Sequence, residues 1–159
     1  MIRLTATTCI DASPARVWAV LATLEDISLW VPAIKHAHCP HARRGEGALR
    51  ICELERFTVH ETITAWDEGR SFTYEGVGAP MMKRARNTWS IEAHGTMTLV
   101  TSVAEVELKG GLFGRVLQPL VASVAQRAGA RSLASLKHLV EHGKAFAGPG
   151  QLAPAPINC

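Results

Sequence analysis

Apolar and polar residues alternate over most of the stretch from residue 34 to residue 108, and a two-residue period predicts β-strands. Together with a β-branched stretch near the N-terminus, this predicts strands at 5–10, 34–39, 48–54, 58–66, 71–77, 86–92 and 97–108. Turn residues such as Asp67-Glu68-Gly69 and His94-Gly95 separate neighbouring strands, with one turn signal about every ten residues. This spacing favours an antiparallel sheet of hairpins over parallel strands joined by helices.

Helical spacing of apolar residues indicates three helices. Ser13 can cap the first, which begins at Pro14, because a serine oxygen accepts a free backbone N–H and proline fits the first turn. A second, short helix is expected over 25–30. The third, over 115–142, is the longest, and Gly143 is a suitable residue to end it. The chain order is therefore strand, two short helices, six strands and a long helix.

Composition limits the class of protein. The chain has 159 residues, a length typical of one domain, and its apolar share of 47% excludes disorder. No apolar run approaches the ~20 residues of a membrane span, and the net charge of +3 is too small and scattered to indicate a nucleic-acid partner. The uncharged residues 148–159 include three prolines and two glycines, which predicts a disordered tail after a domain at 1–147.

Polar residues fall on the face of the predicted sheet that should point inward. Side chains alternate across a strand, so Val59, Ile63 and Ala65 share the apolar face of their strand, and Glu61 lies on the same face. A buried carboxylate is costly unless it is paired, so Arg50 is its natural partner if the two strands are neighbours. The other polar residues that the same count places inward are Tyr74 and Asn87, beside Trp89.

Two interpretations of these residues stay open. One is structural: the two residues form an ion pair in an ordinary core, or the strand pairing is shifted by one residue, which would turn Glu61 to solvent. The other is a polar anchor inside a ligand cavity, because ligand pockets combine apolar walls with a few placed polar groups.

The histidines and known motifs give no sign of a metal or cofactor. His36, His38 and His41 lie near Cys39, but a tetrahedral metal site needs four ligands and no fourth partner is obviously placed. We therefore interpret the cluster as a solvated hairpin. The sequence has no phosphate-binding or dinucleotide-binding motif and no nucleophile motif, so we expect no cofactor and no catalytic triad.

The expected compartment is the cytoplasm. The N-terminal residues contain no apolar stretch typical of a secretory signal, and the four cysteines show no metal-type spacing. Reduced thiols are therefore expected.

The loop after the strand 71–77 contains two adjacent methionines, Met81 and Met82, beside basic residues. Methionine adapts to varied surfaces, so this pair would suit a cavity mouth, a membrane or a partner protein. The alternative is that both side chains fold back on the core.

Short motifs along the chain resemble those of the START-like superfamily, in its polyketide cyclase/dehydrase and lipid-transport branch. In chain order they lie at Ile10–Ala22, Trp30 with Pro32, Gly47–Arg50, His60–Arg70, Tyr74–Pro80, Gly95–Thr98 and Leu133–Glu141. The resemblance implies an α+β helix-grip fold. In this fold a curved antiparallel sheet of about seven strands wraps around a long C-terminal helix, with two short helices after the first strand.

The resemblance also implies a cavity between the sheet and the long helix. Arg50, Glu61 and Tyr74 match positions that line this cavity in the hormone-receptor relatives, and Asn87 is added by strand parity. The strand that carries Trp89 and the helix face at Val124 and Ala128 would complete the wall. The gating loop of those receptors is shortened here to residues 55–57, so hormone reception is not implied.

The function expected first is binding or carriage of a hydrophobic small molecule of lipid, polyketide or isoprenoid type. A second is an aromatase/cyclase or dehydratase, with Glu61 as the general base and Tyr74 or Arg50 stabilising an enolate oxygen. A third is an accessory protein that docks a partner through Met81-Met82 or Leu112-Phe113. We expect a monomer or homodimer, with membrane contact at most transient.

Overall fold

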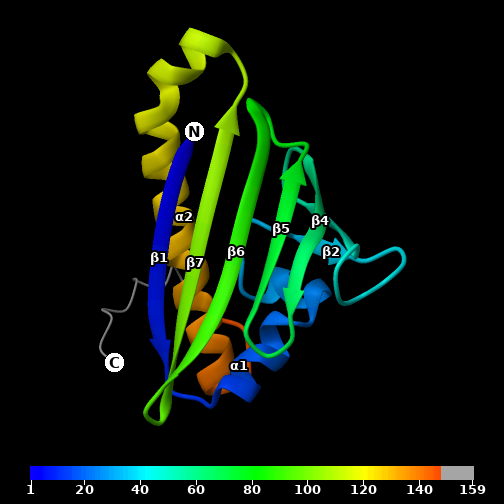
Figure 1. Cartoon of the computed structure of the whole chain (residues 1–159), viewed down its shortest axis with the longest axis vertical. Helices are drawn as coiled ribbons and strands as arrows, with labels where there is room; N and C mark the ends of the chain where they lie inside the picture. Colours follow the sequence, from blue (N-terminus) through cyan, green and yellow to red (C-terminus); the bar gives the residue numbers. More distant parts are fainter. Residues whose placement is uncertain (148–159) are drawn as a thin grey trace.

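The computed structural model describes residues 1–147, apart from the side chains of 112–115, so the predicted disordered tail lies outside the described residues. Seven strands form one antiparallel sheet in the order β1-β7-β6-β5-β4-β3-β2 (Figure 1). The elements are β1 (Ile2–Ile10), α1 (Pro14–Leu21), the 3₁₀ helix η1 (Leu24–Leu29), β2 (His36–His38), β3 (Leu49–Glu53), β4 (Thr58–Asp67), β5 (Ser71–Val77), β6 (Met82–His94), β7 (Met97–Leu108) and α2 (Gly111–His142).

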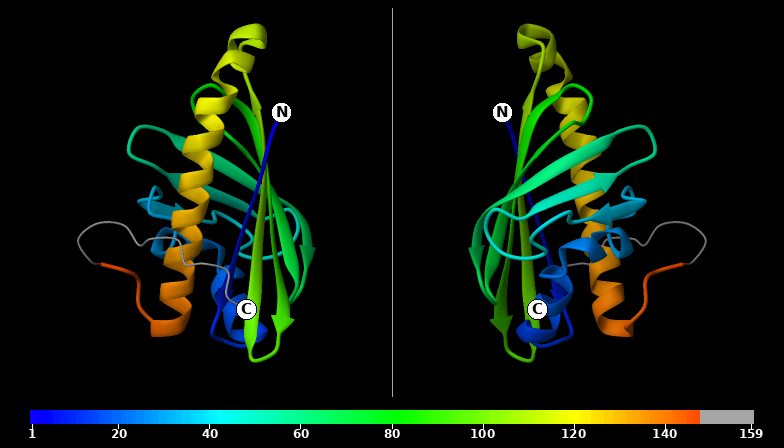
Figure 2. Two further views of the ribbon diagram at one scale, coloured as in Figure 1. Left: turned by 90° about the vertical axis from the view of Figure 1, so that its left-hand side faces the viewer. Right: turned by 90° about the vertical axis from the view of Figure 1, so that its right-hand side faces the viewer.

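The helices cover one face of the sheet. Figure 2 shows α2 running along this face, with α1 on the same side near the C-terminal end of α2. Among the strands, α2 packs chiefly against β1 and then β7. This is the α+β helix-grip arrangement expected from the sequence. Within the described residues, no helix is both long and apolar enough to cross a membrane.

The ends of the helices follow from local chemistry. Ser13 accepts a hydrogen bond from the backbone N–H of Arg16 at 3.4 Å, so the predicted N-cap of α1 is confirmed. Gly143 has a φ of 71° and its N–H bonds to the carbonyl of Leu139, which ends α2 as predicted.

One strand departs from simple alternation. The pairing of β4 with β5 shifts register between Ile63 and Ala65, as a β-bulge does. Ala65 is therefore exposed, and its predicted place on the inner face is wrong. Trp66 takes that place and packs against Trp18 and Phe72, with ring centroids 5.3 and 5.6 Å away.

The core lies between the sheet, α1, η1 and the C-terminal half of α2. Fully buried side chains from each of these parts meet there, among them Val17, Leu21, Leu24, Phe72, Val100 and Leu136. The opposite end of α2 is not covered, since Val116 is 77% exposed and Leu120 is 64% exposed. The closely packed part of the molecule is thus the end that holds α1 and η1.

Candidate ligand-binding site

Arg50 on β3 and Glu61 on β4 face each other on the helix-covered side of the sheet. They are direct partners in the strand register. The Arg50 Nε and Nη2 atoms both lie 2.7 Å from Oε2 of Glu61. Arg50 is 1% exposed and Glu61 is 8% exposed. The predicted pairing is confirmed, and the alternative register that turns Glu61 to solvent is wrong.

Neighbouring groups complete the surroundings of this ion pair. Arg50 Nη1 donates to the carbonyl of Leu24 in η1 at 3.2 Å, and the guanidinium lies 5.0 Å from the centroid of the Tyr74 ring. Cys52 donates its S–H to Glu61 Oε2 at 3.4 Å. Because all three described contacts of the Glu61 carboxylate use Oε2, they leave Oε1 available to a further donor.

Electrostatics set the protonation states of Arg50 and Cys52. Burial acts to lower the pKa of Arg50, but the Glu61 carboxylate, together with Tyr74 and Cys52, outweighs burial and raises it, so the guanidinium stays charged. Burial, helped by the Glu61 charge, raises the pKa of the Cys52 thiol to about 12. Cys52 is therefore a neutral donor, not a nucleophile.

A second polar group lies beside the ion pair. Asn87 on β6 is paired with Tyr74 on β5 and donates from Nδ2 to the Tyr74 hydroxyl at 3.2 Å. Ser102 on β7 donates its hydroxyl to Asn87 Oδ1 at 3.1 Å. Ser102 was not among the predicted site residues, although the same parity count, applied to the strand 97–108, places it on the inner face.

Four tryptophans divide into two environments. Trp30 and Trp89 pack edge to face with centroids 5.0 Å apart, and both indole N–H groups are buried without a hydrogen-bond partner among the described residues. The indoles of Trp18 and Trp66 instead donate to the two carboxylate oxygens of Glu68, each at 2.8 Å. Buried donors without partners are uncommon, so Trp30 and Trp89 are candidates to meet a ligand or water.

The two residues predicted on the long helix are exposed, and their place in a cavity wall stays a prediction. Val124 is 61% exposed and Ala128 is also exposed, so the structure does not bring them to the buried ion pair. The physical reason is that, among the described side chains, α2 is buried only from Ser132 onward. The helix residues in the core cluster are Leu133, Leu136 and Val140.

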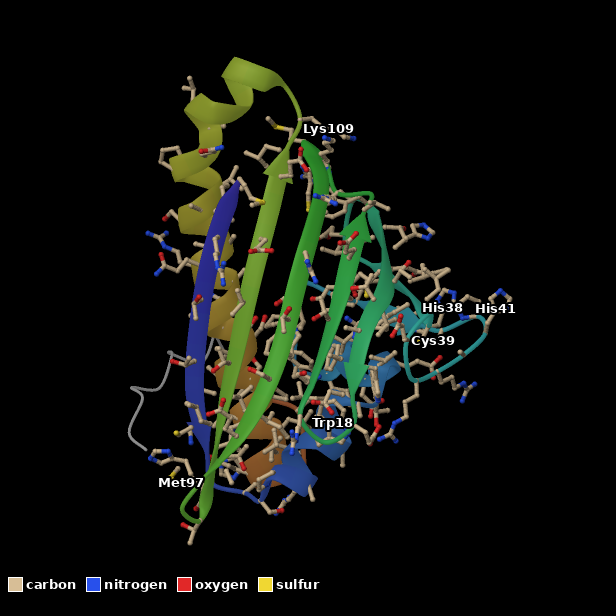
Figure 3. The ribbon with its side chains drawn as sticks, viewed as in Figure 1. Trp18, His38, Cys39, His41, Met97 and Lys109 are labelled. Carbon is tan, nitrogen blue, oxygen red and sulfur yellow. The ribbon has the colours of Figure 1, made fainter. Side chains whose placement is uncertain are left out.

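The predicted histidine cluster with Cys39 lies at the edge of the sheet (Figure 3). Figure 3 shows His38, Cys39 and His41 together at the β2 edge of the sheet. His36 and His38 stack with centroids 5.7 Å apart, and no group of three or more potential metal ligands occurs within the described residues. Cys39 and Cys52 are free thiols, as expected for these two residues.

The methionine loop is partly exposed. Met81 is 51% exposed and has a φ of 59°, which is unusual for a residue with a side chain, while Met82 is half-buried. The Met81 carbonyl accepts a hydrogen bond from the Lys109 N–H at 2.8 Å, which ties the loop to the end of β7. The side chains of Leu112 and Phe113 lie outside the described part of the chain. A docking role for either segment stays a prediction.

The other face of the sheet carries a charged surface pocket of 230 Å³. Its lining is Met1, Glu75, Arg84, Arg86, Glu105 and Glu107. Arginine and glutamate alternate across neighbouring strands here, as in the facing pairs Arg86 with Glu105 and Arg84 with Glu107. These charges largely neutralise one another, so the pocket is explained by cross-strand pairing.

A curved sheet gripping a long helix, with buried polar groups on the gripped face, defines a START-like protein of the helix-grip class. A family model described as "Polyketide cyclase / dehydrase and lipid transport" matches residues 1–141. The chain belongs to this family. A search of curated proteins finds no match.

Solved structures share the fold at low sequence identity. A crystal structure of a protein from Thermus thermophilus has a TM-score of 0.73 and 21% identity, covering 89% of this chain and 99% of that one. A START superfamily protein from Mycobacterium smegmatis has a TM-score of 0.71 and 17% identity, with coverage of 89% and 99%. DynU16, from the dynemicin biosynthetic locus, has a TM-score of 0.66 and 12% identity, and the match covers 90% of this chain but 48% of DynU16.

Proposed function

We propose that this protein binds or carries a small hydrophobic molecule between the sheet and α2. Apolar residues on the inner face of the sheet would supply most of the affinity. The polar end of the molecule would be oriented by Arg50, Glu61 and Tyr74, with Asn87 and Trp89 beside them. No cofactor is needed for this role.

The buried Arg50–Glu61 pair is the observation that carries the proposal. Burying two charges costs more than an apolar core of the same shape, so such a pair is weak support for stability as its purpose. Next to it lie a neutral thiol and Tyr74, whose hydroxyl accepts from Asn87. A few placed polar groups among aromatic and aliphatic side chains are typical of ligand sites. The family description, which includes lipid transport, agrees with this role.

An enzyme acting on a polyketide-like substrate is the second candidate, favoured by the cyclase/dehydrase part of the family description. Glu61 would then be the general base. Its Oε2 atom already accepts from Arg50 and Cys52, so Oε1 is the oxygen that could receive a proton. Loss of turnover in Glu61→Gln with unchanged ligand binding would favour the enzyme over the carrier.

Binding of a neutral apolar fluorophore, N-phenyl-1-naphthylamine, tests the proposal. We expect saturable one-to-one binding to the wild type and to Arg3→Met/Glu105→Met, which removes an exposed ion pair on the outer face. The matched variant Arg50→Met/Glu61→Met should change the affinity, because its substitutions lie at the site. Absence of saturable binding to the wild type, or equal affinity in all three folded proteins, would contradict the proposed site.

A further inference from the structure

Three side chains on neighbouring strands form a hydrogen-bond chain with a fixed direction. Ser102 donates to the carbonyl oxygen of the Asn87 amide at 3.1 Å, and the Asn87 amide nitrogen donates to the Tyr74 hydroxyl oxygen at 3.2 Å. The amide of Asn87 is thus engaged at both ends. The chain runs from β7 across β6 to β5 and ends at Tyr74.

A second donor approaches the same oxygen. The indole N–H of Trp89 lies near the Tyr74 hydroxyl and acts to lower its pKa, although it does not reach the geometry of a hydrogen bond. An indole N–H can only donate, so its approach agrees with an accepting Tyr74 oxygen, while the hydrogen bond from Asn87 carries the assignment. The hydroxyl proton of Tyr74 must then point elsewhere, and none of the hydrogen bonds described for residues 1–147 uses it.

Two features define what this proton can bind. Burial, followed by the nearby Glu61 charge, raises the pKa of Tyr74, so the hydroxyl keeps its proton at physiological pH. The Arg50 and Glu61 charges cancel, so the site offers no net positive charge to offset burial of an anion. An uncharged acceptor therefore fits this position better than a carboxylate.

We propose that Tyr74 donates its hydroxyl proton to an uncharged oxygen of the bound molecule, such as a ketone, ester or amide carbonyl. Asn87 and Ser102 act as positioning residues that hold the hydroxyl in this orientation. This inference rests on the proposed function and specifies the chemical class of the ligand's polar end.

Displacement of N-phenyl-1-naphthylamine by three probes of similar size tests the inference. They are 2-acetylnaphthalene, 2-ethylnaphthalene and 2-naphthoate. At pH 7 we expect the ketone to bind the wild type roughly 3- to 10-fold more tightly than the hydrocarbon, as one net hydrogen bond provides, and the carboxylate to bind most weakly. Tyr74→Phe should remove the advantage of the ketone and leave the affinity of the hydrocarbon unchanged.

The positioning role has its own spectroscopic readout. A hydrogen bond lowers the infrared stretching frequency of the bound carbonyl. With ¹³C-labelled 2-acetylnaphthalene, we expect the carbonyl band of the bound ketone at the lowered frequency in the wild type. In Tyr74→Phe the band should lie at the frequency of a carbonyl without a hydrogen bond, and in Ser102→Ala it should be broadened. Ser90→Ala is the matched control, because Ser90 lies on the opposite face of β6 from Trp89, and it should give the wild-type band.

The outcomes separate the two proposals. If the fluorophore binds but the ketone and hydrocarbon bind the wild type equally, the inference is wrong and the proposed function stands. The inference is also wrong if folded Tyr74→Phe weakens both probes alike, or if Ser102→Ala keeps a sharp wild-type carbonyl band. If no probe and no fluorophore binds the wild type, both proposals fail.

Discussion

Arg50 and Glu61 occupy facing positions on β3 and β4, where both side chains are buried. Strand parity predicted that both side chains face inward, because each shares a face with apolar neighbours two positions away, and the pairing also required that the two strands be neighbours. Parity also placed Tyr74, Asn87 and Trp89 on the same face. It failed at Ala65, because a bulge adds one residue and reverses the alternation that follows.

Removing one member of the pair should be severely destabilising. In Arg50→Met the Glu61 carboxylate is left buried without its partner, and we expect a loss of about 3–5 kcal/mol in unfolding free energy. Urea unfolding at pH 7 measures it. The double variant Arg50→Met/Glu61→Met should recover most of the loss. The control Arg3→Met removes an exposed pair and should cost at most about 1 kcal/mol. A single variant as stable as this control would contradict the account.

Glu141 near the end of α2 predicts a pH dependence of stability. Its carboxylate accepts from the Asp11 backbone N–H at 2.8 Å and from Lys137 at 2.5 Å. Partial burial acts to raise the pKa of Glu141, but these hydrogen bonds outweigh it and hold the pKa below its usual range. The carboxylate is thus stabilised in the folded state, and this contribution is complete above the unfolded-state pKa of about 4.3.

The stability difference between the wild type and Glu141→Gln should therefore be constant at neutral pH. It should shrink as the pH falls below about 4.3 and through the lower folded-state pKa, because protonation favours the unfolded chain. Urea midpoints from pH 3 to pH 7 measure this. Glu46→Gln, in an exposed loop, should follow the wild type throughout. A difference between wild type and Glu141→Gln that does not vary with pH would contradict this role.

At the scale of elements, the helix caps and the turns were predictable from the sequence. The part of α2 that packs against the sheet was not. The order of strands and helices follows from hairpin signals and from residues such as Ser13 and Gly143, whose local chemistry does not depend on the rest of the chain. Which stretch of α2 is covered depends on where the sheet ends in space. Helical spacing alone could not tell that Val124 and Ala128 lie outside the packed stretch.

The turn after β5 depends on a glycine that approaches another strand. Gly78 has a φ of +112°, and an added Cβ would lie 2.4 Å from the carbonyl oxygen of Thr58. We expect Gly78→Ala to cost about 3 kcal/mol or more, because the backbone must move. Gly69→Ala is the control, with a φ of +76° and open space around it, and should cost about 1 kcal/mol. Thermal unfolding measures both variants. Equal losses of unfolding free energy in Gly78→Ala and Gly69→Ala would show that the close approach to Thr58 adds no strain.

At the scale of the whole molecule, the packed end and the buried polar cluster are parts of one arrangement. The sheet, α1, η1 and the last part of α2 bury the aromatic and aliphatic core. The Arg50–Glu61 pair borders this core and reaches η1 through the Leu24 carbonyl. The sequence could predict which residues face inward, and its resemblance to a family predicted the fold. It could not predict Ser102 as the start of the hydrogen-bond chain, because that chain depends on the register of three strands.

The indole N–H signals in a ¹H–¹⁵N NMR titration test the ligand site most directly. The chain has four tryptophans, and two of them are internal controls, because the indole N–H groups of Trp18 and Trp66 are already bonded to Glu68. On addition of 2-acetylnaphthalene we expect saturable shifts of the Trp30 and Trp89 signals and unchanged signals for Trp18 and Trp66. Shifts confined to Trp18 and Trp66, or no saturable shift at Trp30 and Trp89, would contradict a ligand site on the inner face of the sheet.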